Sequence, residues 1–339
     1  MNEHSEHPFA SFLKIVGKGP NLSRSLTREE AADAMAMIIA GRVEPEQLGA
    51  FLLLLRYRGE SAEELAGFVD AARASLSYDR DLASTEDEGR PDIDWPSYAD
   101  RHRQQPWFIL SAMLLAENGF KVLMHGIAGA REGFAPTRPA LQALGLEPSL
   151  DMASALTTMK QTNFGYIGLE HFLPRIEELF HLRPTLGLRT MVNTFARAIN
   201  PIRARCQLQG VVHPNYRTLH QDLSRLLEQP GAAVFKGGGG EVQRNPLKGC
   251  RVFWCREGTS GEEAWPPLLD DVSHDWRAEN LGPESIVDVW RGDLEVPAAR
   301  AAIVGTVGIA LRTLGHAKDL VKADDMASAM WQDRMRDKF

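Results

Sequence analysis

The sequence predicts an α/β protein with a small N-terminal helical bundle domain and a large α/β domain built on a central mixed or parallel sheet. The first 80 residues contain three helices with local start and stop signals, helix-like and strand-like segments alternate beyond residue 105, and an acidic, proline-containing stretch separates the two regions. We expect a helical domain over 1–85 and an α/β domain over 86–339. In an alternative division, helices from 150–185 join the helical domain.

The N-terminal helices carry their own capping signals. Thr27, with Glu30 three residues later, forms a capping box, and Ser61 with Glu64 repeats it. Pro45 stands in the first turn of the helix between them, where proline is favoured. Because the connections are short, the three helices are expected to form a compact bundle. They cover residues 27–41, 44–59 and 61–76.

The larger region alternates between helical and strand-like hydrophobic patterns. Its expected helices cover 106–119, 137–145, 215–227 and 297–315, and its expected strands cover 121–126, 205–212 and 232–237. We interpret 81–100 as a linker in which Asp92 and Asp94 are solvated, and 150–185 as helical without clear strands. The helix over 297–315 is rich in small residues and is expected to pack closely on the sheet.

Composition excludes several function classes. A formal net charge of -7 argues against a protein that coats nucleic acid by bulk charge. Cys206, Cys250 and Cys255 form no CxxC pair, so they predict neither a disulfide framework nor a zinc site. The most apolar run, 48–55, is too short to cross a membrane, and the N-terminus lacks a signal-peptide pattern. We therefore expect a cytoplasmic protein with no membrane association.

Several stretches, in order, resemble the anthranilate phosphoribosyltransferase family, which is glycosyltransferase family 3. They are "LTREEA" through "ELAGF" at 26–68, "HG" at His125 and Gly126, "LRPTLGLRTMVN" at 182–193 and "INP" at 199–201. The resemblance implies a helical domain beside an α/β domain. It also implies a homodimer that pairs through the helical domains.

The motifs that bind phosphoribosyl pyrophosphate in that family are missing. Active members carry a glycine-rich turn whose backbone N–H groups bind the pyrophosphate, and the corresponding stretch here, "SYADRHRQQPWFI" at 97–109, has no glycine. The family's acidic magnesium loop corresponds to "KGGGGEVQRN" at 236–245, where Glu241 is the only acid. We expect no cofactor, no metal and no catalytic residue of the family type. The alternative is magnesium with phosphoribosyl pyrophosphate.

Some positions of the family's ligand pocket survive by resemblance. Arg183 corresponds to a contact with the aromatic acid, and His125 is either a substrate contact or a structural histidine beside a turn. The predicted residual pocket comprises His125, Gly126, Arg183, Gly238, Gly239 and Glu241.

Three further stretches resemble a branch of the family, the YbiB-type proteins. They are "IDWPSYADRHRQQPW" at 93–107, "QGVVHPNY" at 209–216 and "VFKGGGGEVQRNP" at 234–246. The resemblance implies binding of single- or double-stranded nucleic acid without sequence preference, by a homodimer with a basic groove. The candidate phosphate-binding residues are Arg101, Arg103, Arg131, Arg203, Arg205, Lys236, Arg244 and Lys248.

Aromatic side chains near these bases offer a second kind of contact. Bases of a single strand can stack on such rings, and the alternative is that the rings belong to the core. The candidates are Tyr98, Trp107, Phe235 and Trp254. Three functions therefore remain: nucleic-acid binding, phosphoribosyl transfer to an aromatic or nitrogenous acceptor with Arg183 and His125 as ligand contacts, and binding of an unrelated small ligand between the domains.

Overall fold

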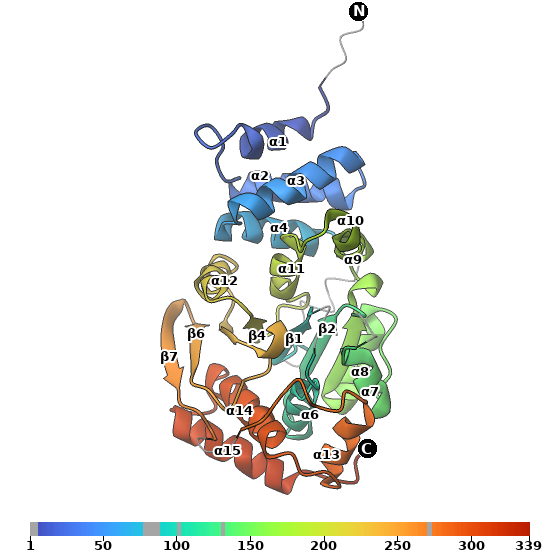
Figure 1. The fold of residues 1–339 in the computed structure, drawn as a ribbon, viewed down its shortest axis with the longest axis vertical. Helices are drawn as coiled ribbons and strands as arrows, with labels where there is room; N and C mark the ends of the chain where they lie inside the picture. Colours follow the sequence, from blue (N-terminus) through green and yellow to red (C-terminus); the bar gives the residue numbers. More distant parts are fainter. Residues whose placement is uncertain (1–5, 77–88, 100–102, 130–132, 270–272) are drawn as a thin grey trace, which may run out of the picture. The chain divides into compact units, whose positions relative to one another are not determined.

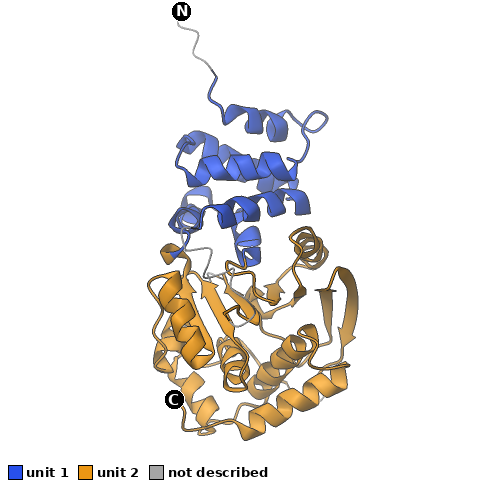
Figure 2. Ribbon diagram, turned by 180° about the vertical axis from the view of Figure 1, so that it is seen from behind, with its two compact units in different colours: residues 1–77, 172–199 blue, residues 78–171, 200–339 orange. Residues whose placement is uncertain are grey.

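The computed structural model describes residues 6–76, 89–99, 103–129, 133–269 and 273–339 (Figure 1). The chain forms two compact units, one from residues 1–77 and 172–199 and the other from 78–171 and 200–339 (Figure 2). We call them the helical unit and the α/β unit. Within the described residues, no helix is both long and apolar enough to span a membrane.

The α/β unit is built on a seven-stranded sheet with the order β3-β2-β1-β4-β5-β6-β7. The first five strands run parallel, and β6 and β7 form an antiparallel hairpin at the edge next to β5. The strands are β1 (Ile93–Ser97), β2 (Val122–Gly126), β3 (Phe164–Gly168), β4 (Cys206–Val211), β5 (Gly231–Lys236), β6 (Cys250–Arg256) and β7 (Thr259–Trp265). The mixed sheet confirms the predicted fold class.

Helices of the α/β unit pack against the sheet. Residues of α6 and α14 share one core with the sheet face that carries Trp95, whereas α12 contacts β5 and β6. Gly308 permits a close approach of α14 to α15, because a Cβ there would lie 2.8 Å from the Asp324 carboxylate. The helices are α6 (Phe108–Glu117), α7 (Thr137–Ala143), α8 (Met152–Thr162), α12 (Asn215–Leu226), α13 (Glu284–Arg291), α14 (Pro297–Thr313) and α15 (Leu320–Asp333), with short 3-10 turns at Leu169–His171 and Gly238–Gly240.

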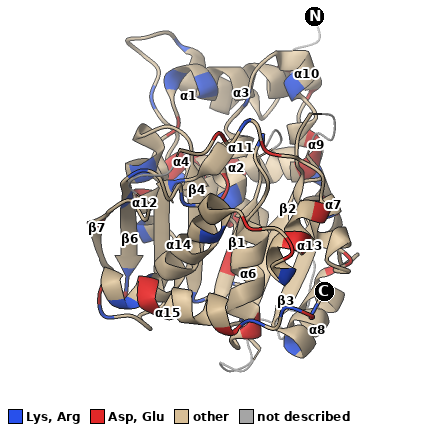
Figure 3. Ribbon diagram, turned by 60° about the horizontal axis from the view of Figure 1, so that its bottom comes forward, with Lys and Arg blue, Asp and Glu red and all other residues tan. Residues whose placement is uncertain are grey.

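Charged residues are scarce in the five parallel strands (Figure 3). Lys236 is exposed at the end of β5, whereas Asp94 in β1 is only 1% exposed. A buried carboxylate needs hydrogen-bond donors, because an uncompensated buried charge is very costly. Asp94 therefore marks a place in the sheet where polar groups must gather.

Three expectations about the α/β region are corrected. The part of the expected linker that lies at 89–99 contains β1 and the buried Asp94, so it is not solvated, and the remainder up to 88 lies outside the described residues. The region 150–185 contains a strand, β3, in addition to helices. The chain joins the helical unit over 172–199, so α8 stays with the α/β unit. The β6–β7 hairpin was not predicted, because its alternating pattern is weak on the exposed strand β7.

The helical unit holds an aromatic core. Phe51 contacts Phe9 and Phe68 with ring centroids 5.2 and 6.3 Å apart, and Phe68 contacts Phe195 at 5.7 Å. Phe195 comes from the returning segment, which ties that segment to the N-terminal helices. The unit contains α1 (Ala10–Gly17), α2 (Arg28–Ile39), α3 (Pro45–Arg58), α4 (Ala62–Ala74), α9 (Pro174–Phe180), α10 (Arg183–Leu186), α11 (Val192–Phe195) and a 3-10 turn at Ala196–Ala198.

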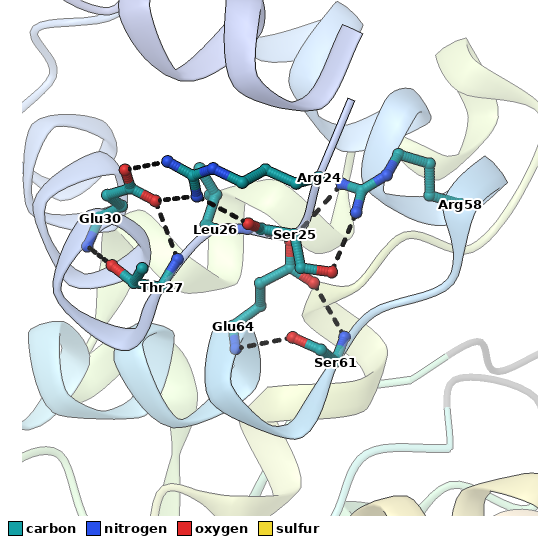
Figure 4. A network of polar contacts seen from close by, with 8 residues as sticks. All are labelled: Arg24, Ser25, Leu26, Thr27, Glu30, Arg58, Ser61 and Glu64. Carbon is teal, nitrogen blue, oxygen red and sulfur yellow. Dashed lines mark hydrogen bonds and ion pairs between the residues drawn. The ribbon is translucent and has the colours of Figure 1, made fainter. Parts of the chain in front are cut away.

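Both predicted capping boxes are present (Figure 4). In the box at α4, the Glu64 backbone N–H donates to Ser61 Oγ at 3.2 Å, and the Ser61 N–H donates to Glu64 Oε2 at 2.8 Å. The same carboxylate accepts from the Leu26 N–H at 2.9 Å and lies 3.6 Å from Arg58. Glu64 is fully buried, so a local helix signal also connects two segments of the bundle.

Candidate functional site

The order in which the chain adds parallel strands to the sheet reverses between β1 and β4. The chain proceeds from β1 to β2 and β3 on one side of β1, and then returns to place β4 and β5 on the other side. In open α/β sheets, ligands bind at the carboxyl ends of the strands beside such a switch point. The turn from β1 to α6 and the glycine run after β5 both lie at this edge of the sheet.

The start of α6 is occupied by acceptors from the protein itself. The Phe108 N–H donates to Gln243 Oε1 at 3.1 Å, and the Gln105 N–H donates to the Glu279 carboxylate at 2.9 Å. The Trp107 indole also donates to Glu279, at 2.9 Å. By resemblance, the pyrophosphate would sit near these N–H groups. A carboxylate at that position repels phosphate and takes the donors that phosphate would use.

The segment around Glu279 holds this arrangement in place. Gln105 Nε2 donates to the carbonyls of Asn280 and Gly282, both at 2.6 Å, and His274 pairs with Glu279 at 3.0 Å. Glu279 lies about 170 residues from α6 in the sequence, and no local pattern predicts this contact. We call Glu279 and Gln243, together with the N–H groups they accept from, the self-capped turn.

The glycine run after β5 packs against β4. A Cβ at Gly237 would lie 1.7 Å from the Glu241 carbonyl oxygen, and a Cβ at Gly210 would lie 2.0 Å from the same atom. Gly239 and Gly240 adopt φ values of 63° and 95°, which favour glycine. The glycines therefore allow a close crossing of two backbones and a tight turn, and of the predicted pocket positions Gly239 is exposed and Gly238 is half-buried.

Glu241, the acid of the glycine loop, contacts the end of β1. Its side chain is 2% exposed, and Oε1 accepts from the Ala99 N–H at 2.6 Å. Magnesium requires several oxygen ligands in near-octahedral geometry and usually keeps waters. Within the described residues, no group of three or more histidine, cysteine or acidic side chains can hold a metal. The single acid of this loop serves as an acceptor for the end of β1.

Asp94 is the centre of a buried chain of hydrogen bonds. Its Oδ1 lies 3.0 Å from His125 Nε2, and its Oδ2 accepts from Gln207 Nε2 at 2.7 Å. Beyond these partners, Tyr98 Oη lies 2.7 Å from His125 Nδ1. On the other side, Gln209 Nε2 donates to Gln207 Oε1 at 2.6 Å, and His220 Nδ1 lies 2.5 Å from Gln209 Oε1.

In this series of hydrogen bonds, every donor points toward Asp94 when His125 carries its proton on Nε2 and Tyr98 donates to His125 Nδ1. This assignment follows from the carboxylate, which can only accept when it is ionised. Chains of aligned hydrogen bonds polarise one another in a low-dielectric interior. These hydrogen bonds thus compensate the buried charge of the Asp94 carboxylate.

The structural alternative for His125 agrees with this geometry. His125 is fully buried, with one ring nitrogen beside Asp94 and the other beside Tyr98. Gly126 is also a packing position, because a Cβ there would lie 2.0 Å from the Ser97 carbonyl oxygen. Arg183 lies in α10 of the helical unit and is half-buried. The predicted residual pocket is thus divided between packing roles and two separate units.

The predicted basic residues do not all lie at the same edge of the sheet. Arg103, Lys236 and Lys248 lie at the carboxyl edge of the parallel strands, whereas Arg203 and Arg205 precede β4 at the amino edge. The two edges are separated by the length of a strand, roughly 17–20 Å. Arg205 also lies 3.7 Å from Asp92. Arg101 and Arg131 lie outside the described residues.

Arg244 is a correction to the predicted set. It is fully buried, donates to the Pro266 carbonyl at 2.6 Å and lies 3.4 Å from Asp324. Its guanidinium carbon lies 4.9 Å from the centroid of the Trp265 ring. Burial lowers the pKa of Arg244 and raises that of Asp324. Arg244 joins α14 and α15 to the sheet and cannot reach a surface ligand in this structure.

The predicted stacking aromatics are also core residues. Tyr98, Trp107 and Phe235 are at most 2% exposed, which favours the core alternative for them. The half-buried Trp254 lies over Gly261, where a Cβ would approach its ring to 2.6 Å, and Arg256 lies 5.8 Å from the ring centroid. Tyr98, Trp107 and Phe235 are therefore not available to a base, and Gly261 lies against the ring of Trp254.

A basic cluster that includes the predicted Lys236 lies on the α12 side of the sheet. Arg217 of α12 and Arg251 of β6 place their guanidinium carbons 5.2 and 5.7 Å from the centroid of the Phe253 ring. Phe235 of β5 pairs with Val252 of β6 in an antiparallel ladder. Lys236, the next residue of β5, therefore lies opposite Arg251. One acid, Glu262, pairs with Arg251. We call Arg217, Lys236 and Arg251 the α12–β6 basic cluster.

The three cysteines are buried thiols. Burial raises the pKa of Cys250 and of Cys255 to about 11, and it raises the pKa of Cys206 further. A thiol with a raised pKa forms little of the reactive thiolate at neutral pH. These residues contribute packing and form no disulfide.

Comparisons with known proteins agree with this architecture. The model of the glycosyl transferase family helical bundle domain matches residues 10–76, and the model of the glycosyl transferase family a/b domain matches residues 109–263. The chain is 27% identical over 281 residues to the "Uncharacterized protein YbiB" of Escherichia coli K12, which covers 77% of this chain and 84% of that protein. It is 29% identical over 244 residues to an anthranilate phosphoribosyltransferase of Oleidesulfovibrio alaskensis, which covers 70% of each chain.

Solved structures extend the likeness to nearly the whole chain. Anthranilate phosphoribosyltransferase from Thermus thermophilus matches with a TM-score of 0.77 and 22% identity, over 95% of this chain and 94% of that one. The enzyme from Saccharomyces cerevisiae, in complex with phosphoribosyl pyrophosphate and magnesium, matches with a TM-score of 0.74 and 13% identity, over 99% and 97%. The two family models together span well over half of the sequence. The chain belongs to glycosyl transferase family 3 and has the anthranilate phosphoribosyltransferase fold.

Proposed function

We propose that this protein binds nucleic acid on its phosphoribosyltransferase fold and does not transfer phosphoribosyl groups. The observation that carries the proposal is the self-capped turn, in which Gln243 accepts from the first N–H of α6 and Glu279 accepts from the Gln105 N–H just before the helix. A carboxylate that already holds two donors excludes a pyrophosphate from that position. The phosphate-binding capacity then has to come from the surface.

The α12–β6 basic cluster offers that surface. Two of its three cations, Arg217 and Arg251, lie against the Phe253 ring, and among the described residues Glu262 is the acid paired with Arg251. The half-buried Tyr216 packs beside the same ring, and His213 is exposed one turn before it. Clustered Lys and Arg bind a phosphate backbone without reading its sequence, and they do so even when the whole chain is acidic. Exposed Lys248 and Arg103 lie at the same edge of the sheet.

Fluorescence anisotropy with a labelled single-stranded oligonucleotide tests this proposal. With three phosphates neutralised, the logarithm of the association constant should fall with the logarithm of salt concentration with a slope of about -2. Arg217→Gln and Lys236→Gln should each weaken binding several-fold at low salt and reduce the slope by about 0.7.

Arg203→Gln and Arg205→Gln are the matched controls, because both residues are exposed bases at the amino edge of the sheet. They should leave affinity and slope unchanged. Binding that is insensitive to salt, or that is lost in the controls and kept in the cluster variants, would contradict this assignment.

We propose that the protein acts as a homodimer that pairs through the helical unit. Leu53 and Tyr57 of α3 stand four residues apart on one helix face and are 37% and 90% exposed, and Leu22 is 74% exposed. Exposed apolar side chains in one region favour a protein contact. Light scattering after size exclusion should give twice the monomer mass for the wild type and a monomer for Tyr57→Asp. A wild-type protein with the mass of a monomer would contradict the proposed homodimer.

Phosphoribosyl transfer is the second candidate, favoured by the family membership and by relatives that are named anthranilate phosphoribosyltransferase. It requires that phosphoribosyl pyrophosphate with magnesium binds the folded chain and raises its melting temperature by mass action. A rise in melting temperature at millimolar ligand, together with release of pyrophosphate in the presence of anthranilate, would favour this candidate over nucleic-acid binding alone.

A further inference from the structure

A cavity of about 300 Å³ lies between the connection from α13 to α14 and the C-terminal residues 331–336. Three arginines, Arg300, Arg334 and Arg336, line it. Glu295 is the one acid in the lining, and Leu294 and Trp331 supply apolar wall. The cavity lies apart from both the self-capped turn and the α12–β6 basic cluster, neither of which shares a residue with it.

Arg334 is fixed in place by the protein. It is 7% exposed, and its Nε and Nη1 donate to the carbonyls of Trp290 and Trp331 at 2.8 and 2.7 Å. The guanidinium carbon lies 3.7 Å from the centroid of the Trp331 ring. A guanidinium held by backbone carbonyls and an aromatic face has lost its conformational freedom before any ligand arrives. Its Nη2 also donates to the Val289 carbonyl at 3.4 Å, and the N–H groups that are left are preorganised for an acceptor.

The three arginines outnumber Glu295, the acid that lines the cavity with them. Burial lowers the pKa of Arg334 to about 10, Arg336 and Arg300 contribute to the lowering by repulsion, and Glu117 opposes the shift. A Cβ at Gly292 would lie 3.1 Å from Arg336 Nη1 and 3.8 Å from Arg334 Nη2, so the two guanidinium groups approach each other across a glycine. Across the part of the chain that the structure describes, none of the three arginines forms an ion pair with a carboxylate.

The start of α14 adds to the same field. Val296 and Pro297 line the cavity and are the N-cap and first residue of this 17-residue helix. No side chain caps the helix, and its first turn contains no acid. The positive end of the helix dipole therefore stands beside the arginines, and the acid next to it is Glu295, the residue before the N-cap.

We infer that this cavity binds a small phosphate dianion, either inorganic phosphate or the phosphate group of a monoester. Guanidinium groups match the oxygen geometry of phosphate, and a dianion would relieve the repulsion among three cations. A volume of about 300 Å³ is at the lower end of small-molecule sites, and the wall at Leu294 and Trp331 leaves space for a small organic group. This site goes beyond the proposed function and does not depend on it.

Isothermal titration calorimetry of the full chain with inorganic phosphate, and separately with ribose 5-phosphate, tests the inference. Saturable binding of one ligand per chain is expected. Arg300→Gln and Arg336→Gln should each weaken it at least about tenfold, because each removes a charge-assisted hydrogen bond. Both side chains are exposed, so these variants should fold. Tighter binding of the ester than of inorganic phosphate would show that the apolar wall takes part, and equal binding would show that the phosphate alone is recognised.

Arg225→Gln is the matched control, because Arg225 is an exposed arginine on α12 that pairs with Asp222 and lies outside the cavity. Its phosphate affinity should equal that of the wild type. The inference is overturned if neither ligand binds saturably at millimolar concentration, or if Arg336→Gln and Arg225→Gln behave alike. Because phosphate is titrated without nucleic acid, failure here leaves the oligonucleotide result untouched.

Discussion

Two helix starts in this molecule are capped in opposite ways. At α4 in the helical unit, Ser61 and Glu64 satisfy each other's backbone N–H groups within four residues of sequence. At α6 in the α/β unit, the N–H groups receive acceptors from Gln243 and Glu279, more than 130 residues away. The first arrangement builds a bundle. The second closes a helix start at the carboxyl edge of the sheet with acceptors from distant segments.

The difference teaches that a helix start can be capped either by its own sequence or by a distant part of the fold. A helix start needs acceptors for its first N–H groups, and a phosphate can supply them. Side chains of the protein can supply them as well. Here the Glu279 carboxylate also accepts from the Trp107 indole, so the same contact stabilises the turn and repels an anion.

The largest expected effect is at the α4 cap. Glu64 is fully buried, accepts from Ser61 and Leu26, and lies 3.6 Å from Arg58. Glu64→Ala should destabilise the helical unit by about 3 kcal/mol, because it leaves a buried cation and two N–H groups without their acceptor. Hydrogen exchange of peptides from α2 and α4 measures it. Exchange unchanged from the wild type would show that the cap does not stabilise the bundle.

Glu279→Ala should destabilise the α/β unit by about 2 kcal/mol through loss of acceptors for Gln105 and Trp107. All seven tryptophans lie in this unit, so fluorescence during urea unfolding reports on it alone. Glu279→Gln keeps one acceptor oxygen and should cost less than the alanine variant. Equal losses would mean that charge, and not hydrogen bonding, governs the turn.

A direct comparison of the two caps uses Gln243→Ala and Ser61→Ala. Each removes one side-chain acceptor from a helix start, and each should cost about 1 kcal/mol in its own unit. Tryptophan fluorescence follows the first variant, and hydrogen exchange at α4 follows the second. If Gln243→Ala has no effect, water replaces the remote cap and the self-capped turn is weaker than we propose.

The smallest expected effect concerns the exposed box at α2. Hydrogen bonding to Arg24 lowers the pKa of Glu30 to about 2 from its ordinary value of 4.5. A lowered folded-state pKa contributes stability that is present above pH 4.5 and is lost as the pH falls toward 2. The contribution should not exceed about 1 kcal/mol, because the pair is exposed to solvent. Thermal melts of wild type and Glu30→Gln should therefore differ at pH 7 and converge near pH 2.

The parts of the fold that follow local rules were predictable from sequence. Thr27 and Ser61 predict the starts of α2 and α4, because the two partners of a capping box are only three residues apart. β1 was missed because Pro96 and two aspartates resemble a linker, and only the burial of Asp94 beneath His125 and Gln207 explains them.

The site was less predictable for the same reason. By resemblance, the family's glycine turn and paired acids are missing from the sequence, but the acceptor at this turn could not be predicted, because Glu279 reaches it only through the tertiary fold. A basic stretch of sequence likewise does not reveal which of its side chains are buried. Arg244 and Lys236 lie in the same loop region, and one is fully buried while the other is exposed.

Titration of phosphoribosyl pyrophosphate with magnesium into the wild-type protein tests the self-capped turn most directly. Isothermal titration calorimetry should show no saturable heat at millimolar ligand, because Glu279 and Gln243 already hold the N–H groups at the start of α6. Saturable binding of one ligand per chain, abolished by a bulky substitution at Gly238 or Gly239, would contradict the account and return the site to phosphoribosyl chemistry.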